Sequence, residues 1–219
     1  MTTATAKCIA MPRNADRLRL MQMLSPAFPV GSYAYSQGLE QAITDGAVQG
    51  PDSLTQWVRA VLTHGAARMD AILLAHGRSG ANLTDLAYAY AASAERVTEM
   101  REQGAAFGQV IASITGQVPP ALPYALALAD ATRALDLPTE DVLALYMQAL
   151  AAQMISAAVR FVPLKAADGQ RVLAGLADTI TALAALYATE PLTALSSATL
   201  GADLAQMRHE TMEVRIYRT

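Results

Sequence analysis

The stretch VLALYMQALAAQMISAAV, residues 142–159, carries no charged side chain and does most to decide the fold class. Its length approaches the roughly 20 residues that a membrane-spanning helix needs. However, Gln148, Gln153 and Ser156 interrupt it, and alanine supplies much of its apolar character. We therefore interpret it as the central helix of an all-α core, buried on nearly all sides, and expect no contact with a membrane.

Helical periodicity extends over most of the remaining chain. Pro119, Pro120 and Pro123 interrupt it, because proline cannot lie inside a helix. No convincing run of alternating apolar and polar residues predicts a strand. The expected helices cover approximately residues 16–25, 35–45, 53–73, 84–111, 126–137, 139–162 and 172–187, with a kink near Gly65 and either one helix or two over 84–111.

These patterns predict an all-α fold, a compact single-domain helical bundle. Residues 16–204 would form the domain, residues 1–15 a flexible N-terminal segment, and residues 205–219 a C-terminal tail that binds a partner. The chain has 219 residues, of which 53% are hydrophobic, so it is long enough for one sizeable core.

Charge and cysteine content exclude several classes of protein. The net charge of −3 gives no reason to expect binding to nucleic acid or to an anionic membrane. The single cysteine, Cys8, excludes an intramolecular disulfide framework, and the first residues lack the continuous apolar segment of a secretion signal. We therefore expect a cytoplasmic protein.

One candidate nucleophile is Ser36, in the sequence AYSQG. A nucleophile elbow reads G-x-S-x-G between a strand and a helix, but here Ala34 replaces the first glycine. His209 lies downstream, as a catalytic triad requires, and Asp178 or Asp203 would be its acid. A small helical serine hydrolase using Ser36 and His209 is therefore the alternative to a structural hydroxyl, which a serine near a helix start more often provides.

The histidines do not predict a metal site. His64 and His76 are twelve residues apart, which on one helix separates them by about 18 Å, too far to share an ion. His209 stands in the cluster MRHE, and one imidazole is not a site. The chain also lacks a glycine-rich phosphate loop. We expect no tightly bound cofactor and no intrinsic nucleotide hydrolysis.

The sequence SAERVTEMREQG, residues 93–104, is the most polar helical segment. Glu95, Glu99 and Glu102 recur on one side of the expected helix, with Arg96 and Arg101 beside them. Three aligned carboxylates repel one another, so a cation must relieve them. This face is either solvated or binds a partner.

The last twelve residues, RHETMEVRIYRT, have an unusual composition for a terminus. Arg208, Arg215 and Arg218 accompany the apolar side chain of Ile216 and the ring of Tyr217. Arginine mixed with aromatic and apolar residues is typical of interface anchors. The alternative is that this segment docks on its own domain.

Several of these stretches together resemble one known family, the urease accessory protein F family. The matching sequences are SPAFPVGSYAYSQGLE (25–40), ERVTEMREQG (95–104), AAVRFVPLKAADGQR (157–171) and MRHETMEVRIYR (207–218). They occur in the family's order across nearly the whole chain. Lys165 stands where the family more often has glycine, and Ile216-Tyr217 stand where Leu-Phe is usual.

The resemblance implies a non-enzymatic chaperone of urease maturation that forms homodimers. Its partners would be a scaffold, the accessory protein D (called H in some species), and a nickel-delivering GTPase, the accessory protein G, whose activity the complex would regulate. The complex would dock on apo-urease and support nickel insertion, with nickel passing through the partner complex. The residues expected to bind partners are Tyr33, Tyr35, Ser36, Gln37, Glu40, Arg160, Lys165, Arg208, His209, Glu210, Arg215, Tyr217 and Arg218.

Overall fold

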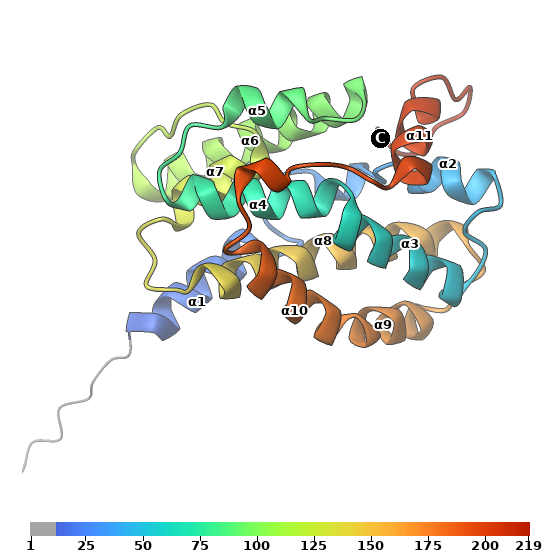
Figure 1. The fold of residues 1–219 in the computed structure, drawn as a ribbon, viewed down its shortest axis with the longest axis horizontal. Helices are drawn as coiled ribbons and strands as arrows, with labels where there is room; N and C mark the ends of the chain where they lie inside the picture. The colour runs from blue at the N-terminus through green and yellow to red at the C-terminus, as the bar shows by residue number, and fades with distance from the viewer. Residues whose placement is uncertain (1–11) are drawn as a thin grey trace, which may run out of the picture.

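The computed structural model describes residues 12–219, which form an assembly of helices without a strand (Figure 1). This confirms the all-α prediction. The helices are α1 Pro12–Met23, α2 Leu39–Thr44, α3 Pro51–His64, α4 Ala66–Arg78, α5 Thr84–Ala89, α6 Ala94–Thr115, α7 Tyr124–Thr132, α8 Thr139–Phe161, α9 Ala166–Gly175, α10 Ala177–Tyr187 and α11 Leu200–His209, with 3₁₀ turns η1 Ser32–Ala34 and η2 Leu192–Ala194.

Helix α8 is the central helix that the charge-free stretch predicts. It packs against α10 and α4, and its buried side chains include Val142, Leu143 and Met147. Its most apolar window has a mean hydropathy of 1.7, enough for a membrane span by composition, but 56% of that window is buried inside the fold, as in a core helix. Burial on nearly all sides was wrong, because Leu145 and Ser156 remain exposed along one face.

Three helix boundaries differ from the expected pattern. Gly65 adopts an extended conformation, so the expected kink is a full break between α3 and α4. Residues 84–111 contain two helices, and Ser93 caps the second by accepting a hydrogen bond from the Arg96 N–H at 3.0 Å. The expected helix over 172–187 is divided at Leu176.

The proline-containing linker between α6 and α7 lies directly on α6. A Cβ atom at Gly104 would come within 2.0 Å of the Leu122 carbonyl oxygen. Only glycine permits so close an approach of the two backbones. Gly116, in a left-handed conformation, ends α6 before the prolines, and Gly104 allows the linker to pack α7 against it.

Helix α1 begins at Pro12 and so includes residues 12–15 of the predicted N-terminal segment, while residues 1–11 lie outside the described part of the chain. Asp16 is inside α1 and accepts a hydrogen bond from the Asp136 N–H at 2.9 Å. A helix start at Pro12 is in keeping with the preference for proline in the first turn of a helix.

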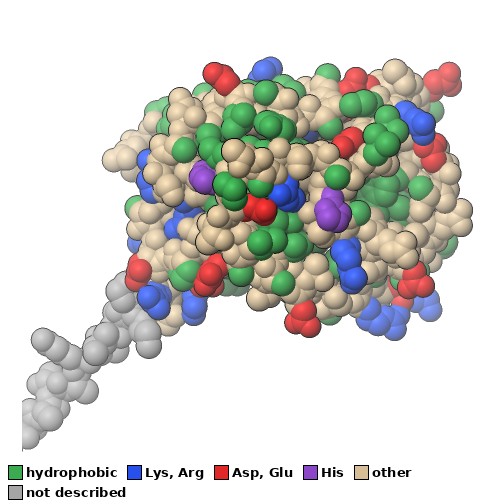
Figure 2. Space-filling model, viewed as in Figure 1, with side chains coloured by type: hydrophobic (Ala, Val, Ile, Leu, Met, Phe, Trp, Pro, Cys, Tyr) green, Lys and Arg blue, Asp and Glu red, His purple; other side chains and the backbone are tan. Residues whose placement is uncertain are grey.

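The segment after α10 crosses α4 and leads to α11, which lies beside α2 at one end of the molecule (Figure 1). Arg68 on α4 anchors this crossing by donating to the Ala194 carbonyl oxygen at 2.6 Å. Helix α11 was not among the expected helices. Figure 2 shows charged side chains of both signs scattered over the viewed face, in keeping with the small net charge.

Candidate functional site

The SQG sequence forms a sharp turn that leads into α2. Gln37 and Gly38 both have positive φ angles, 54° and 79°. A Cβ at Gly38 would lie 2.7 Å from the backbone nitrogen of Gln206, so glycine lets α2 approach α11 closely. The main-chain oxygen of Thr219 accepts hydrogen bonds from the Ser36 hydroxyl and, at 2.8 Å, from the Ser36 N–H. The turn therefore holds the last residue of the chain.

Glu40, in the first turn of α2, is the main receptor for the tail, residues 210–219. Its Oε1 accepts the Ile216 N–H and its Oε2 accepts the Tyr217 N–H, both at 2.9 Å. Burial alone would raise the pKa of the Glu40 carboxyl, but hydrogen bonds from His209, Tyr217 and Ile216 outweigh it, so the pKa is lowered. The carboxylate is therefore the form that binds the tail.

His209, at the end of α11, is fully buried between two carboxylates. Its Nε2 lies 3.0 Å from Glu40 Oε2, and its Nδ1 lies 2.8 Å from Glu95 Oε2. The other Glu95 oxygen accepts a hydrogen bond from Arg215 at 2.7 Å. This cluster joins α2, α6, α11 and the tail.

A second set of contacts holds the end of the tail at Arg218, the residue that follows Tyr217. The Arg218 N–H donates to the Ala34 carbonyl oxygen at 2.7 Å, and the Arg218 side chain pairs with Glu102 on α6. The Tyr35 hydroxyl donates to the same Glu102 carboxylate. Burial and the hydrogen bond to Glu102 raise the pKa of the Tyr35 hydroxyl to about 12, so it remains protonated.

The Tyr217 ring is buried against the fold, with its centroid 5.3 Å from that of Phe161 on α8. The tail is thus docked on its own domain, which is one of the two alternatives that its composition left open. Docking does not hide the whole tail, because Val214 is 77% exposed and Ile216 is 70% exposed. Backbone contacts hold the segment while these apolar side chains face outward.

A buried ion cluster lies beside the tail contacts. Arg96 pairs with Asp70 on α4 and, at 2.8 Å, with Glu99. The Tyr146 hydroxyl donates to Asp70 at 2.8 Å, and Gln37 Nε2 donates to Glu99 at 3.0 Å. This cluster connects the core to the turn that holds the tail.

The composition of α6 suggested that its charged face is either solvated or binds a partner. Most of this face instead contacts other parts of the same chain. Arg96 and Glu99 are buried in the ion cluster, whereas Glu95 and Glu102 bind the tail. The expectation that cations relieve the aligned carboxylates is confirmed. Of the charged residues named on this face, only Arg101 makes none of these contacts, and its side chain is exposed.

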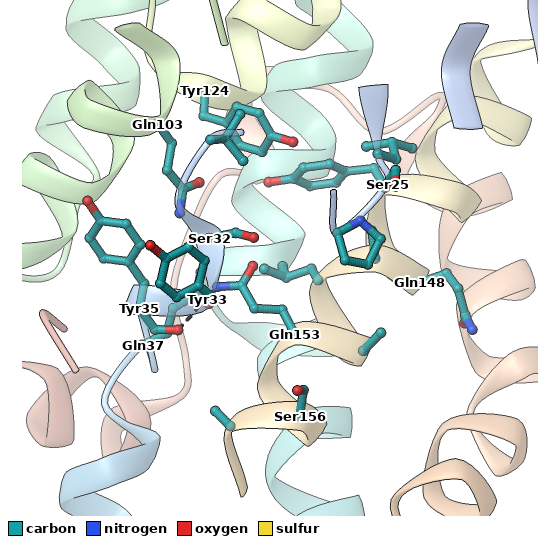
Figure 3. Close-up of a pocket in the computed structure, with 18 of the residues that line it drawn as sticks. Ser25, Ser32, Tyr33, Tyr35, Gln37, Gln103, Tyr124, Gln148, Gln153 and Ser156 are labelled. Carbon is teal, nitrogen blue, oxygen red and sulfur yellow. Dashed lines mark hydrogen bonds between the residues drawn. The ribbon is translucent and has the colours of Figure 1, made fainter. Parts of the chain in front are cut away.

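A groove of about 730 Å³ opens beside the tail, between the end of α1, η1 and α8 (Figure 3). Tyr33, Tyr35 and Gln37 line one side, and Gln153 and Ser156 on α8 line the other. The three polar residues that interrupt the apolar stretch of α8 all line this groove. The interruption of the apolar stretch by these polar residues was the signal in the sequence that could have predicted the groove.

The apolar residues of α1 are divided between the core and the surface. Leu18 and Met21 are 68% and 60% exposed, whereas Leu20 is fully buried. Met21 and Leu24 line the groove. The helix therefore leaves an apolar strip beside the opening.

Comparison with known proteins agrees with this arrangement of motifs. A family model described as UreF matches residues 48–177. A protein named urease accessory protein UreF from Cereibacter sphaeroides (strain KD131 / KCTC 12085) is 52% identical, over 94% of this chain and 100% of its own. The chain belongs to the UreF family. A second UreF relative, from Paracoccus denitrificans (strain Pd 1222), is 47% identical over 100% of both chains.

Membership of the UreF family identifies the chain as a urease accessory protein rather than the urease catalyst. The geometry gives no support to the alternative hydrolase. The Ser36 hydroxyl donates to Thr219, and both ring nitrogens of His209 face carboxylates. Asp203 accepts a hydrogen bond from Ser197 at 2.6 Å. These contacts do not assemble a triad.

Three of the expected UreF partner-binding residues lie away from the tail cluster. Tyr33 is 72% exposed at the groove, and Arg160 lines the groove near Tyr217. Lys165 precedes α9, where its N–H donates to Asp168 at 3.0 Å. The structure therefore divides the expected residues between the groove, the loop after α8 and the tail.

The remaining two residues extend the tail cluster along α11. Arg208 lies 3.5 Å from Asp45 at the end of α2. Glu210 accepts a hydrogen bond from the Ala94 N–H at 2.8 Å, at the N-terminus of α6. Both contacts join α11 to neighbouring helices of the same chain, and both side chains remain accessible at the surface.

Proposed function

We propose that this UreF-family chain is an assembly chaperone of urease maturation in the cytoplasm. It binds the scaffold accessory protein D (H in some species) and the GTPase accessory protein G, and the complex docks on apo-urease to support nickel insertion. The observation that carries this proposal is the docked tail with outward-facing apolar side chains. Family membership supports the accessory role.

The scaffold would bind the surface formed by the tail and α11. Leu200 and Met207 on α11 are 70% and 47% exposed, and Val214 and Ile216 are exposed apolar side chains of the tail. Arg215 is partly exposed beside them, at 43% of its side chain. Apolar side chains with arginine at the rim are characteristic of protein–protein interfaces. Because the backbone is already held, binding requires little additional ordering.

A second copy of the chain would occupy the groove. The exposed apolar residues Leu18 and Met21 lie on α1, whose end forms one wall of the groove. A twofold axis would therefore let each copy contribute apolar side chains to the other's groove, as an isologous interface requires. Tyr33, exposed at the same opening, would be buried by this contact.

Nickel would be cargo supplied by the GTPase rather than a resident ion of this chain. Within the described residues, His, Cys, Asp and Glu side chains do not gather in groups of three or more suited to a metal. Around His209, the two glutamates approach opposite nitrogens of the ring, so the three side chains do not converge on one point. We propose accordingly that this subunit organises the assembly and holds no cofactor tightly.

The test is co-purification of the scaffold with an Ile216→Glu variant. Ile216 is 70% exposed, so the substitution should preserve the fold while placing a charge in the proposed interface. We expect binding to weaken about tenfold or more. The matched control is Val118→Glu, because Val118 is 91% exposed in the linker after α6. Wild-type affinity in the Ile216 variant, with an unchanged melting temperature, would contradict the assignment of this surface.

A further inference from the structure

His209 has a hydrogen-bonding arrangement that requires a specific protonation state. Its two ring nitrogens lie 2.8 Å and 3.0 Å from carboxylate oxygens of Glu95 and Glu40. A neutral imidazole has one N–H and one lone pair, whereas the imidazolium has two N–H groups. Both contacts are therefore hydrogen bonds only when the ring carries two protons.

The carboxyl groups of Glu40 and Glu95 cannot supply the protons for their hydrogen bonds with the His209 ring. Both oxygens of Glu40 accept backbone N–H groups, from Ile216 and Tyr217. The second oxygen of Glu95 accepts from the Arg215 guanidinium. Arg215 forms an ion pair with Glu95, and hydrogen bonds from the ring and the tail lower the pKa of Glu40. The second proton therefore belongs on the ring.

We propose that doubly protonated His209 is a latch for the tail, and that loss of one ring proton releases residues 210–219. This inference rests on the proposed function, because the docked tail presents the proposed scaffold-binding surface and release would dismantle it. The latch therefore makes the presentation of that surface dependent on pH.

The charges around His209 support this proposal. Glu40 faces it from α2, Glu95 from α6, and Arg215 from the tail, while Arg208 and Asp45 form a separate pair nearer the surface. With the imidazolium, the two carboxylates and two cations of the inner group are balanced. With a neutral ring, one buried carboxylate oxygen faces a nitrogen lone pair, which is destabilising in a site removed from water.

The direction of the pH dependence follows from these charges. Histidine is the side chain whose charge normally changes nearest to neutral pH. The latch is closed while the ring is charged and opens as the pH rises. It also opens at strongly acidic pH, when the Glu40 carboxylate that receives the tail becomes protonated.

The experiment follows the backbone amides of Ile216 and Tyr217 by NMR in the isolated full chain, from about pH 5.5 to 9, together with the His209 ring signals. We expect the amide shifts and their loss of protection to share one midpoint with the ring. Amides that stay protected across this range, or that change at a midpoint different from that of the ring, would overturn the proposal.

Two variants separate the latch from a merely structural role. His209→Gln has both of its N–H groups on one nitrogen, so it cannot reach the two carboxylates that face opposite ring nitrogens, and it should increase amide exchange in the tail roughly tenfold or more. The control His64→Gln changes an exposed histidine and should leave tail exchange unchanged.

Glu95→Gln supplies the second variant, because an amide N–H can donate to a neutral ring nitrogen. It should keep the tail docked across the range of the NMR titration, from about pH 5.5 to 9. A tail that still titrates in this variant would overturn the latch, as would unchanged exchange in His209→Gln. These measurements contain no partner, so they test the latch alone, whereas scaffold co-purification tests the proposed function.

Discussion

Helix α6 contributes to two buried charge clusters that differ in their source of positive charge. In the core cluster, Arg96 neutralises Asp70 and Glu99. In the tail cluster, His209 lies between Glu40 and Glu95, supported by Arg215. Arginine remains charged at every physiological pH, but histidine does not. The first cluster is therefore a permanent part of the core, and the second can hold a segment reversibly.

Arg96→Met breaks the permanent cluster and should have the largest effect. It leaves two buried carboxylates without their cation, which costs about 3–5 kcal/mol of unfolding free energy. Urea denaturation measures the loss. The control is Arg101→Met on the exposed side of the same helix, where a change within about 0.5 kcal/mol is expected. A loss below about 1 kcal/mol in Arg96→Met would contradict the assigned role of the core cluster.

Glu40→Gln breaks the reversible cluster. We expect a loss of about 1–3 kcal/mol, because the backbone N–H groups of Ile216 and Tyr217 no longer share a carboxylate. The pKa of Glu40 is lowered in the folded protein, so its carboxylate stabilises the fold fully at pH values above the ordinary glutamate pKa of about 4.3. This contribution to the free energy of unfolding is lost as the pH falls through the lowered pKa. Thermal melts across acidic pH should show a shallower dependence in the variant.

Gly38→Ala tests whether the close approach of α2 and α11 positions the tail cluster. Alanine at a φ of +79° is strained by about 1–3 kcal/mol, and its Cβ would also meet the Gln206 backbone. Gly116→Ala is the control, because Gly116 has a φ of +74° but open space around its Cβ position. Limited proteolysis should cut the tail faster in Gly38→Ala only. Equal cutting in both variants would show that strain, rather than contact with α11, is responsible.

Tyr35→Phe should have the smallest effect. It removes one hydrogen bond to Glu102 while Arg218 keeps its pairing with the same carboxylate. The expected loss of stability is about 0.5–1.5 kcal/mol. In the wild type, ultraviolet titration should show the Tyr35 hydroxyl ionising only near pH 12. An ordinary tyrosine titration curve for this residue would contradict the buried contact.

The sequence predicted α8 and the proline linker because each follows from local patterns, and it placed a kink near Gly65 where the structure has a full break. It did not predict α11, whose buried residues include Ala202, Ala205 and Gln206 rather than an apolar stripe. The charged face of α6 was misjudged for a related reason. Spacing shows which residues share a helix face, but it does not show what packs against that face.

By itself, the sequence determined the helical class, the position of the central helix and the family, because periodicity and motifs are properties of neighbouring residues. Only the tertiary structure decided that Glu40, Glu95 and His209 meet around the tail. These residues come from three helices far apart in the chain, and no local pattern records their pairing. The physical reason is that the packing of α2, α6 and α11, allowed by glycine at position 38, brings their charges together.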